Sequence, residues 1–258
     1  MVSKLYQAFL NDRFFTTREA STLLPNISTR KNTLRQLLDS NQIVKVRQGI
    51  YEIVPLEQIG QQKPVADKFL LGRKLTSPHC FSHHSALEIH GFANTVIYNT
   101  VYMASPREFR SFTYEGVRYR WISRANMAGV EKTIWSSVEI VVTDREMTIV
   151  DCIDRINLGG GFEEVFKSLS SMRNVNFERL YSYAKARGKI ILFHKLGFFM
   201  SQKAIGESWG IDRNKLSRIR ANLSSKVYYL QSPKSKGKLV REWNLMVPEA
   251  IKGKMSFA

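Results

Sequence analysis

The amino-acid sequence predicts an α+β protein, with an N-terminal winged helix–turn–helix followed by a larger α+β domain that ends in a β-hairpin. Three helical patterns and then two strand patterns around a glycine occupy the chain from Met1 to Val54. Short strands and helices alternate from Lys68 onward, as in α+β domains. Between the two parts, PLEQIGQQKP lacks apolar periodicity and is bounded by prolines. We therefore expect domains at residues 1–56 and 65–258, joined by a linker at residues 57–64.

The first domain is expected to contain three helices and one hairpin. The second helix, Arg18–Leu24, has Thr16 or Thr17 at its N-cap and Glu19 in its first turn. The third helix begins with Ser28 as its cap. The other expected ranges are Val2–Leu10 for the first helix, Ser28 to about Ser40 for the third, and Ile43–Arg47 and Ile50–Val54 for the hairpin strands. The expected core residues are Val2, Leu5, Ala8, Phe9, Ile27, Leu34, Leu37 and Leu38.

The second domain is expected to contain short strands, helices and a closing hairpin. The expected strands are Val101–Ala104, Val117–Ile122 and Val138–Val142, and the hairpin pairs Val227–Leu230 with Leu239–Val247. The expected helices are Ser85–His90, which Gly91 ends, Asp144–Arg155, Phe162–Met172, Phe177–Arg187 and Ile190–Gln202.

Composition and cysteine content restrict the class of protein. The chain has 258 residues, of which 43% are hydrophobic and 24% are charged, so that it can bury a core. No apolar run approaches the ~18 residues of a membrane span, and the polar residues in the first segment exclude a secretory signal there. Cys80 and Cys152 lie far apart, which excludes a zinc finger or a disulfide scaffold. We expect a reduced, cytoplasmic protein that does not engage a membrane.

The charge balance points to a polyanionic partner. The net charge is +17, and Met200–Ala258 alone holds 12 basic and four acidic residues. A field of this sign in a cytoplasmic chain favours nucleic acid. Together with the expected winged helix, this charge makes double-stranded operator DNA the expected partner.

The face of the third helix opposite its leucines is the expected DNA-reading surface. Asn32 and Gln36 can pair with adenine edges in a major groove, and cations beside them can hold phosphates. Lys45, Arg47 and Gln48 place donors at the tip of the wing. The full set of expected DNA-binding residues is Thr17, Ser28, Thr29, Arg30, Lys31, Asn32, Thr33, Arg35, Gln36, Lys45, Arg47 and Gln48. The alternatives are a winged helix used for protein contact and a solvated polar face.

A second basic region lies near the C-terminus. Gln202–Arg220 spaces small and apolar residues as a second helix–turn–helix would. For base reading we favour the alternative, a helical connector with a solvated basic face. We favour phosphate contact over base reading here because of the local charge excess. The expected auxiliary DNA-binding residues are Arg213, Lys215, Arg218, Arg220, Lys234, Lys236 and Lys238.

Ordered motifs along the chain resemble those of the AbiEi family, the antitoxins of type IV (abortive infection) toxin–antitoxin systems. The motifs are VRQGIYEIV, SHHSALEIHGF, VYMASPR, VRYRW, TDREMTIVDCID, GGFEEV, KLGFFM and REWNLMVP. The segment from Lys203 to Lys226 does not align with the family. The resemblance implies a transcriptional autorepressor of a toxin–antitoxin operon that counteracts a toxin similar to nucleotidyltransferases. It assigns DNA binding to the N-terminal domain and antitoxicity to the C-terminal domain.

Motifs for catalysis or cofactor binding are weak. His79, His83, His84 and His90 lie close in sequence, but without the spacing of a zinc helix we expect a packed cluster. Asp144, Asp151 and Asp154 share one helix, where Asp144 fits an N-cap and the others its polar side. No lysine has an acid two residues before it, as a restriction-type nuclease would need. Gly159–Gly161 lacks the Lys-Ser/Thr of a phosphate loop.

We therefore expect no enzyme activity, no cofactor and no metal. Two other functions remain open on the sequence alone. One is a nucleic-acid-processing enzyme whose winged helix docks its substrate. The other is an adaptor that neutralises the toxin by direct contact.

Overall fold

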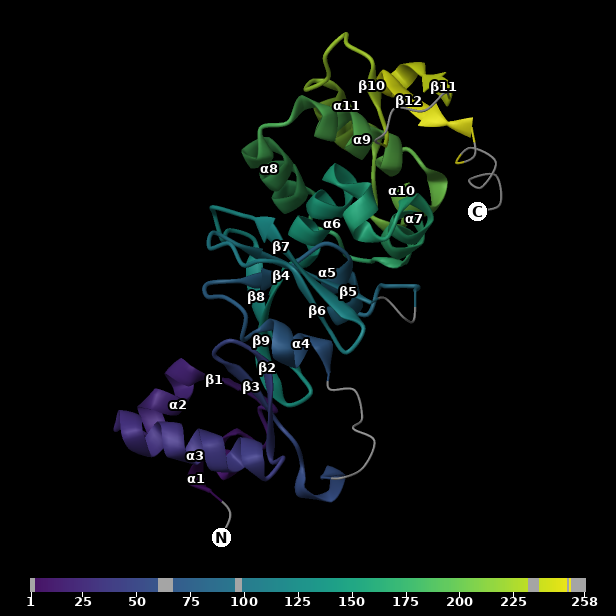
Figure 1. Ribbon diagram of the computed structural model, residues 1–258. Helices are drawn as coiled ribbons and strands as arrows, with labels where there is room; N and C mark the ends of the chain where they lie inside the picture. The colour runs from purple at the N-terminus through teal and green to yellow at the C-terminus, as the bar shows by residue number, and fades with distance from the viewer. Residues whose placement is uncertain (1–2, 60–66, 96–98, 232–236, 250, 252–258) are drawn as a thin grey trace. The chain divides into compact units, whose positions relative to one another are not determined.

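The computed structural model describes residues 3–59, 67–95, 99–231, 237–249 and 251 and divides into two compact units (Figure 1). It is an α+β structure, as predicted, and its strands pair both parallel and antiparallel. The first unit comprises Met1–Cys80, Asn99–Met127 and Lys132–Val141, and the second comprises Phe81–Tyr98, Ala128–Glu131 and Val142–Ala258. The first unit thus holds the whole expected N-terminal domain together with strands of the expected larger domain. Most of the expected linker, from residue 60 on, lies outside the described residues.

Three helices and a three-stranded antiparallel sheet form the N-terminal part of the first unit. The strand order is β1-β3-β2, with Phe14 opposite Glu52 and Ile43 opposite Ile53. The elements are α1 (Lys4–Phe9), β1 (Phe14–Thr16), α2 (Thr17–Leu23), α3 (Ile27–Asp39), β2 (Ile43–Arg47) and β3 (Ile50–Ile53). The predicted helices and hairpin are confirmed. The sequence did not predict β1, because three residues are too few to show a period.

Side-chain caps determine where α2 and α3 begin. The Thr16 hydroxyl accepts from the Glu19 N–H at 3.1 Å, and the Glu19 carboxylate accepts from the Thr16 N–H at 2.7 Å, which forms a capping box. The Asn26 side chain caps α3 by accepting from the Thr29 N–H at 3.0 Å. The prediction of Ser28 as the cap is wrong, because Asn26 already performs this role and Ser28 lies inside the first turn.

The core of this N-terminal part joins all three helices to the sheet. Its buried members are Leu5, Tyr6, Phe9, Phe15, Ala20, Leu34, Leu37, Ile43 and Ile53, and Leu38 packs against them. The predicted inward position of Ile27 is wrong, since this first residue of α3 is 60% exposed. Ala8 is also exposed, and Tyr6 instead takes the buried position on α1, where its hydroxyl donates to the Val54 carbonyl at 2.7 Å. Val2 lies outside the described residues.

The other strands combine parallel and antiparallel pairing. Strands β5 (Thr100–Ser105) and β7 (Val117–Ser123) are parallel, and β6 (Phe112–Tyr114) pairs antiparallel with β7. Strands β4 (Cys80–Phe81), β9 (Val138–Thr143) and β8 (Val130–Trp135) are neighbours in that order. Strands β5, β7 and β9 were predicted, whereas β4, β6 and β8 were not. The first unit also contains the 3-10 turn η1 (Leu56–Gln58) and helix α4 (Lys68–Gly72).

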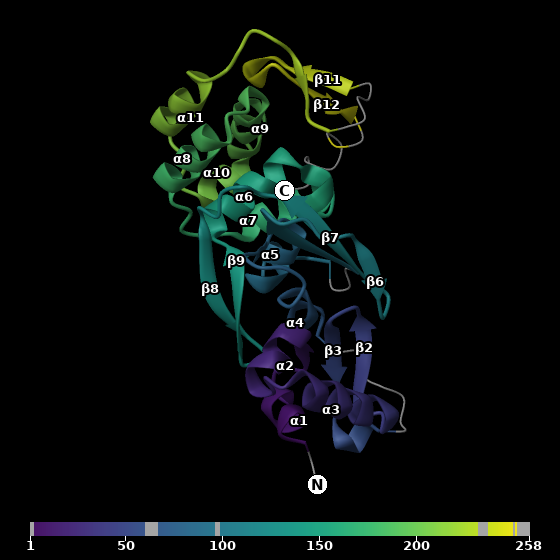
Figure 2. The same ribbon diagram turned by 60° about the vertical axis from the view of Figure 1, so that its left-hand side comes forward.

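Helices dominate the second unit, in which α6, α7, α8 and α9 pack around one apolar core (Figure 2). The bounds are α5 His84–Ile89, α6 Arg145–Asp154, η2 Ile156–Gly159, α7 Phe162–Ser171, α8 Phe177–Arg187, α9 Ile190–Met200, α10 Lys203–Ser208 and α11 Arg213–Arg220. The predicted helices α5 to α9 are confirmed. Helix α9 is buried from Leu192 to Met200. None of the helices in the described part of the chain is long and apolar enough to cross a bilayer.

The C-terminal strands differ from the predicted hairpin. The order is β10 (Tyr228–Tyr229), β12 (Leu245–Pro248) and β11 (Gly237–Val240), and β10 is parallel to β12. The single strand predicted over Leu239–Val247 is wrong, because the 3-10 turn η3 (Arg241–Trp243) and the left-handed Asn244 (φ 43°) divide it. This break positions Trp243, which is fully buried, against α9 at Gly197, where a Cβ would meet its ring at 2.1 Å.

Candidate nucleic-acid interface

Helix α3 packs by one side and presents a polar face on the other. Leu34 and Leu37 are 8% and 3% exposed and hold the helix on the core. Of the residues expected to contact DNA on this helix, Ser28, Thr29, Lys31, Asn32, Arg35 and Gln36 are exposed, and Arg30 and Thr33 are half-buried. Within the described residues, the side chains of Lys31, Asn32 and Gln36 have no hydrogen-bonding or ion-pair partner. The buried leucines thus fix α3 to the core. The polar groups on the opposite face of the helix are available to a ligand.

Arg30 has a structural role at the turn between α2 and α3. Its guanidinium donates to the carbonyls of Leu24 at 2.7 Å and Pro25 at 3.2 Å. These contacts satisfy carbonyl groups at the end of α2. Arg35, in contrast, makes only a loose pair with Asp39, at 3.9 Å between two exposed side chains. Arg35 is therefore the more available of these two cations.

The β2–β3 hairpin turns at Gly49, whose φ of +77° suits glycine. The Gly49 carbonyl accepts from the Thr17 N–H at 2.8 Å, so that the turn is tied to the start of α2. Lys45 and Gln48 are exposed, and Thr17 is half-buried. Arg47 is half-buried, with its guanidinium 4.8 Å from the centre of the Phe112 ring. The hairpin thus offers Lys45 and Gln48 to solvent, while Arg47 packs on β6.

Acidic side chains of the N-terminal part form ion pairs with cations from other segments of the chain. Lys74 contacts Asp12 at 3.3 Å and also contacts Glu19. Burial alone would raise the pKa of Glu19, but hydrogen bonds from Lys74 and Thr16 lower it below its usual value. Arg73 contacts Asp12 at 2.7 Å, and Arg13 contacts the buried Glu52 at 3.3 Å. Asp12, Glu19 and Glu52 are thus each paired with a cation in this part of the chain.

Helices α10 and α11 are joined by a short turn in which Gly210 has a φ of +59°. The Asp212 side chain caps α11 by accepting from the Lys215 N–H at 2.8 Å. Ile205 and Ile219 are buried and fix the two helices to the core. The segment from Gln202 to Arg220 is therefore two helices around a turn.

The cations expected to form an auxiliary DNA contact are mostly engaged within the second unit. Arg218 donates to both carboxylate oxygens of Glu178, and Arg220 contacts Glu242 while lying 5.0 Å from the Trp243 ring centre. Lys215 donates to the Gly210 carbonyl at 2.7 Å. Arg213 and Lys238 are exposed and have no such partner among the described residues. Lys234 and Lys236 lie outside the described residues.

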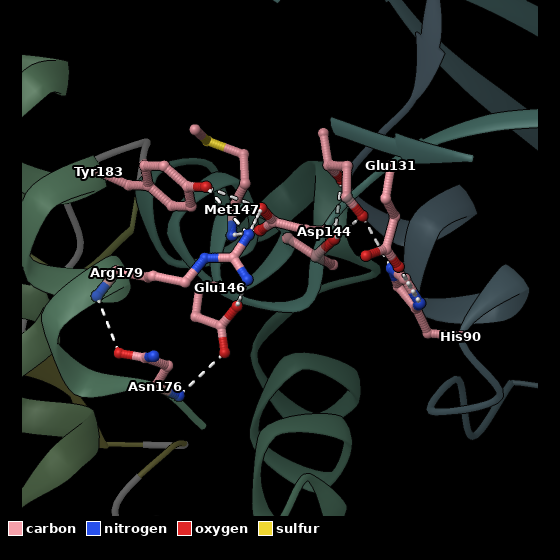
Figure 3. Close-up of polar contacts among 10 residues, drawn as sticks. His90, Glu131, Asp144, Glu146, Met147, Asn176, Arg179 and Tyr183 are labelled. Carbon is pink, nitrogen blue, oxygen red and sulfur yellow. Dashed lines mark hydrogen bonds and ion pairs between the residues drawn. The ribbon is translucent and has the colours of Figure 1, made fainter. Parts of the chain in front are cut away.

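A polar network in the second unit surrounds the start of α6 (Figure 3). Asp144 is the N-cap, as predicted, and accepts from the Met147 N–H at 2.8 Å. The same carboxylate accepts from Arg179 at 2.6 Å and from the Tyr183 hydroxyl at 2.8 Å. Glu146 accepts from the Asn176 N–H at 2.9 Å. The Asp144 and Glu146 carboxylates thus accept their hydrogen bonds within this network. The network joins α6 to α8 and has a structural role.

The other acids of α6 are buried, which corrects their predicted position on a polar side. Asp151 is 1% exposed and pairs with Arg187. The Asp154 side chain is 6% exposed and pairs with Lys189 at 2.6 Å. Ion pairing compensates for the burial of both carboxylates.

The histidines are spread over separate contacts. His84 is fully buried beside Glu88 and Glu164, at 3.1 and 3.3 Å, and His90 contacts the Thr143 carbonyl at 2.7 Å. His83 contacts the Ser82 hydroxyl at 2.9 Å. Within the described part of the chain, no three His, Cys, Asp or Glu side chains are arranged to hold a metal ion.

Residues that position the interface without lying on it were missed from the sequence. They include Asn26, Glu52, Lys74 and Tyr114. Only Asn26 carried a local signal, as a good N-cap residue just before α3. The others come from distant segments and meet only in the folded chain.

Comparison with known proteins supports the fold. No family model matches the chain, and no curated protein resembles it significantly. Among solved structures, the chain is similar to the RV2827C protein from Mycobacterium tuberculosis, with a TM-score of 0.66 and 14% identity. The similarity covers 95% of this chain and 90% of that chain. At this identity the likeness concerns the fold alone.

Proposed function

We propose that the N-terminal part is a winged helix–turn–helix in which α3 enters the major groove of double-stranded DNA. The observation that carries this proposal is the exposed face of α3, where Lys31, Asn32 and Gln36 are without partners among the described residues and the helix is held by buried leucines. The element order α1-β1-α2-α3-β2-β3 agrees with this assignment. In it, the β2–β3 hairpin is the wing.

The chemistry of this face suits sequence-specific reading. Asn32 and Gln36 lie one helical turn apart, so that both amides can reach base edges in one groove. Lys31 and Arg35 lie together on one flank of this pair and can contact phosphates there. The net charge of +17 adds a long-range attraction to DNA that salt screens.

We further propose that the protein is an antitoxin that represses its own toxin–antitoxin operon and counteracts a nucleotidyltransferase-like toxin. This part rests on the resemblance of its ordered motifs to the AbiEi family. Coexpression with a toxin encoded beside it tests this function separately: growth should be restored by the full chain. Failure to restore growth would contradict the antitoxin proposal and leave the DNA-binding proposal standing.

Gel retardation of the protein's own upstream region tests DNA recognition. The wild-type chain should retard that fragment at lower concentration than a shuffled fragment of equal length. Asn32→Ala should cost roughly 1–3 kcal/mol on the upstream fragment and little on the shuffled one. Gln7→Ala is the matched control, because Gln7 is an exposed amide on α1 outside the expected DNA-binding face. Equal loss on both fragments for Asn32→Ala would refute base reading by this residue.

A further inference from the structure

A cavity of about 340 Å³ lies in the second unit. Its lining includes Arg155, Ile156, Asn157, Gly161, Lys195 and Leu230. These residues come from the segment between α6 and α7, from α9 and from the end of β10. The volume is within the range of small-molecule pockets. No role described above uses it.

Lys195 is the unusual member of this lining. It is 7% exposed, and its ammonium donates to the Asp154 main-chain carbonyl at 2.9 Å. An ammonium has three donors, and among the described residues no other acceptor takes the remaining two. A buried ammonium with unsatisfied donors is costly unless a further acceptor occupies the space beside it.

The surroundings of Lys195 leave it without a carboxylate of its own. Asp154 also lines the cavity, but its carboxylate is bound by Lys189 at 2.6 Å. Burial lowers the pKa of Lys195 to about 8, although Asp154 opposes the effect, and Lys189 lowers it further. The side chain therefore still carries its charge at neutral pH for most of the time.

The other cavity residues supply a second cation and an apolar wall. Arg155 is exposed and has no ion-pair partner among the described residues. Ile156 and Leu230 are buried and apolar. At Gly161 an added Cβ would meet nothing within 4 Å, so that the backbone is open there. The glycine segment lacks the lysine of a phosphate loop in sequence, but Lys195 supplies an ammonium to the same cavity from α9.

We propose that this cavity binds a small phosphate monoester, with the phosphate on Lys195 and Arg155 and the organic group against Ile156 and Leu230. Phosphate oxygens offer enough acceptors for both cations and for the Asn157 amide. The paired Asp154 carboxylate adds little repulsion. The cavity lies in the second unit, and the proposal does not rest on the proposed DNA contact by α3.

Isothermal titration with phenyl phosphate tests the proposal on the full chain. Benzoate and phenol serve as ligands that keep the ring but replace or remove the phosphate. Phenyl phosphate should bind, benzoate at least several-fold more weakly, and phenol not measurably. Lys195→Met, which keeps an apolar stem of similar length, should weaken phenyl phosphate about tenfold or more. Lys167→Met is the matched control, since Lys167 is an exposed lysine of α7 outside the cavity.

The affinity for phenyl phosphate, measured over a series of pH values, tests the proposal in a second way. This test does not depend on comparing variants at one pH. The ligand's second ionisation, near pH 6, is complete above about pH 7. The charged groups around Lys195 are Asp154, Arg155 and Lys189. Affinity of the wild type should therefore fall between about pH 7 and 9 as Lys195 loses its proton, and this fall should be absent in Lys195→Met. A cooperative thermal unfolding transition, like that of the wild type, would show that Lys195→Met is folded.

Several results would overturn the proposal. These are absence of binding by phenyl phosphate, benzoate binding as tightly as the phosphate, and equal weakening by Lys195→Met and Lys167→Met. A pH dependence that is unchanged in Lys195→Met would also contradict it.

Discussion

The Tyr114 hydroxyl of β6 donates a 2.6 Å hydrogen bond to Glu52, a fully buried carboxylate of β3. Arg13 reaches the other oxygen of the same carboxylate at 3.3 Å. Glu52 belongs to the hairpin that we propose as the wing, whereas Tyr114 is 62 residues further along the chain. The proposed DNA-binding part is therefore held in place by a residue outside the predicted domain of residues 1–56.

Tyr114→Phe should lower the free energy of unfolding by about 1–3 kcal/mol, because it leaves a buried carboxylate with one donor fewer. Urea unfolding of the full chain measures the change. Tyr51→Phe is the control, since the Tyr51 ring stacks on Phe15 and its hydroxyl has no hydrogen bond in the described part of the chain. Equal effects of the two variants would show that the hydrogen bond to Glu52 adds nothing.

Lys74→Met should reduce the dependence of stability on acid pH. The lowered pKa of Glu19, against an ordinary value of 4.5, means that its ionised form stabilises the folded state above about that pH. This stabilisation is lost as the pH falls through the lower, folded-state pKa. Between about pH 5 and 3 the melting temperature should thus fall more steeply for the wild type than for Lys74→Met. Lys4→Met removes an exposed lysine of α1 and should keep the wild-type slope.

Arg30→Gln and Lys31→Gln should separate support of α3 from contact with DNA. Arg30→Gln removes two contacts to the carbonyls that end α2, so we expect stability to fall by about 1 kcal/mol and DNA binding to weaken as well. Lys31→Gln should leave stability within about 0.5 kcal/mol and weaken binding to all DNA sequences alike. Chemical denaturation measures the stability of each variant, and gel retardation measures its binding to DNA. A loss of stability in Lys31→Gln would contradict the exposed, partner-free position of this lysine.

Salt titrations should distinguish the engaged from the available cations of α11. If Arg213 contacts a phosphate, Arg213→Gln should reduce the slope of log affinity against log salt by about 0.9. Arg218→Gln should leave the slope nearly unchanged, because Glu178 already pairs with Arg218 in the folded chain. An unchanged slope for Arg213→Gln would mean that Arg213 does not contact a phosphate.

Elements with a clear apolar period were predictable from the sequence, and elements without one were not. Helix α7 and strand β9 carry clear periods of apolar residues and lie where expected. Strand β4 has two residues, and β8 is largely solvent-facing, with Ile134 67% exposed. Neither offers a run of alternating apolar and polar residues, which is the signal that a strand needs.

The two candidate sites also differ in how far the sequence could predict them. The exposed face of α3 follows from helical spacing, since Leu34 and Leu37 define the side that is buried. The cavity around Lys195 could not be predicted, because that lysine lies within the apolar run of α9 and its neighbours come from other segments. The predicted strand Leu239–Val247 failed at Asn244, whose left-handed backbone no apolar period reveals.

On α3, the residues that support the fold differ from the residues that are available to a ligand. This separation affects how the protein can diversify. The fold of α3 depends on its caps, on Arg30 and on the two buried leucines. The side chains of Lys31, Asn32 and Gln36 make no hydrogen bond or ion pair within the described part of the chain. Substitutions at such exposed positions typically change stability by less than about 0.5 kcal/mol. Under the proposed function, a lineage could thus exchange one operator sequence for another without a compensating change in its core. Paralogous repressors could in this way become insulated from each other's promoters while keeping the same scaffold.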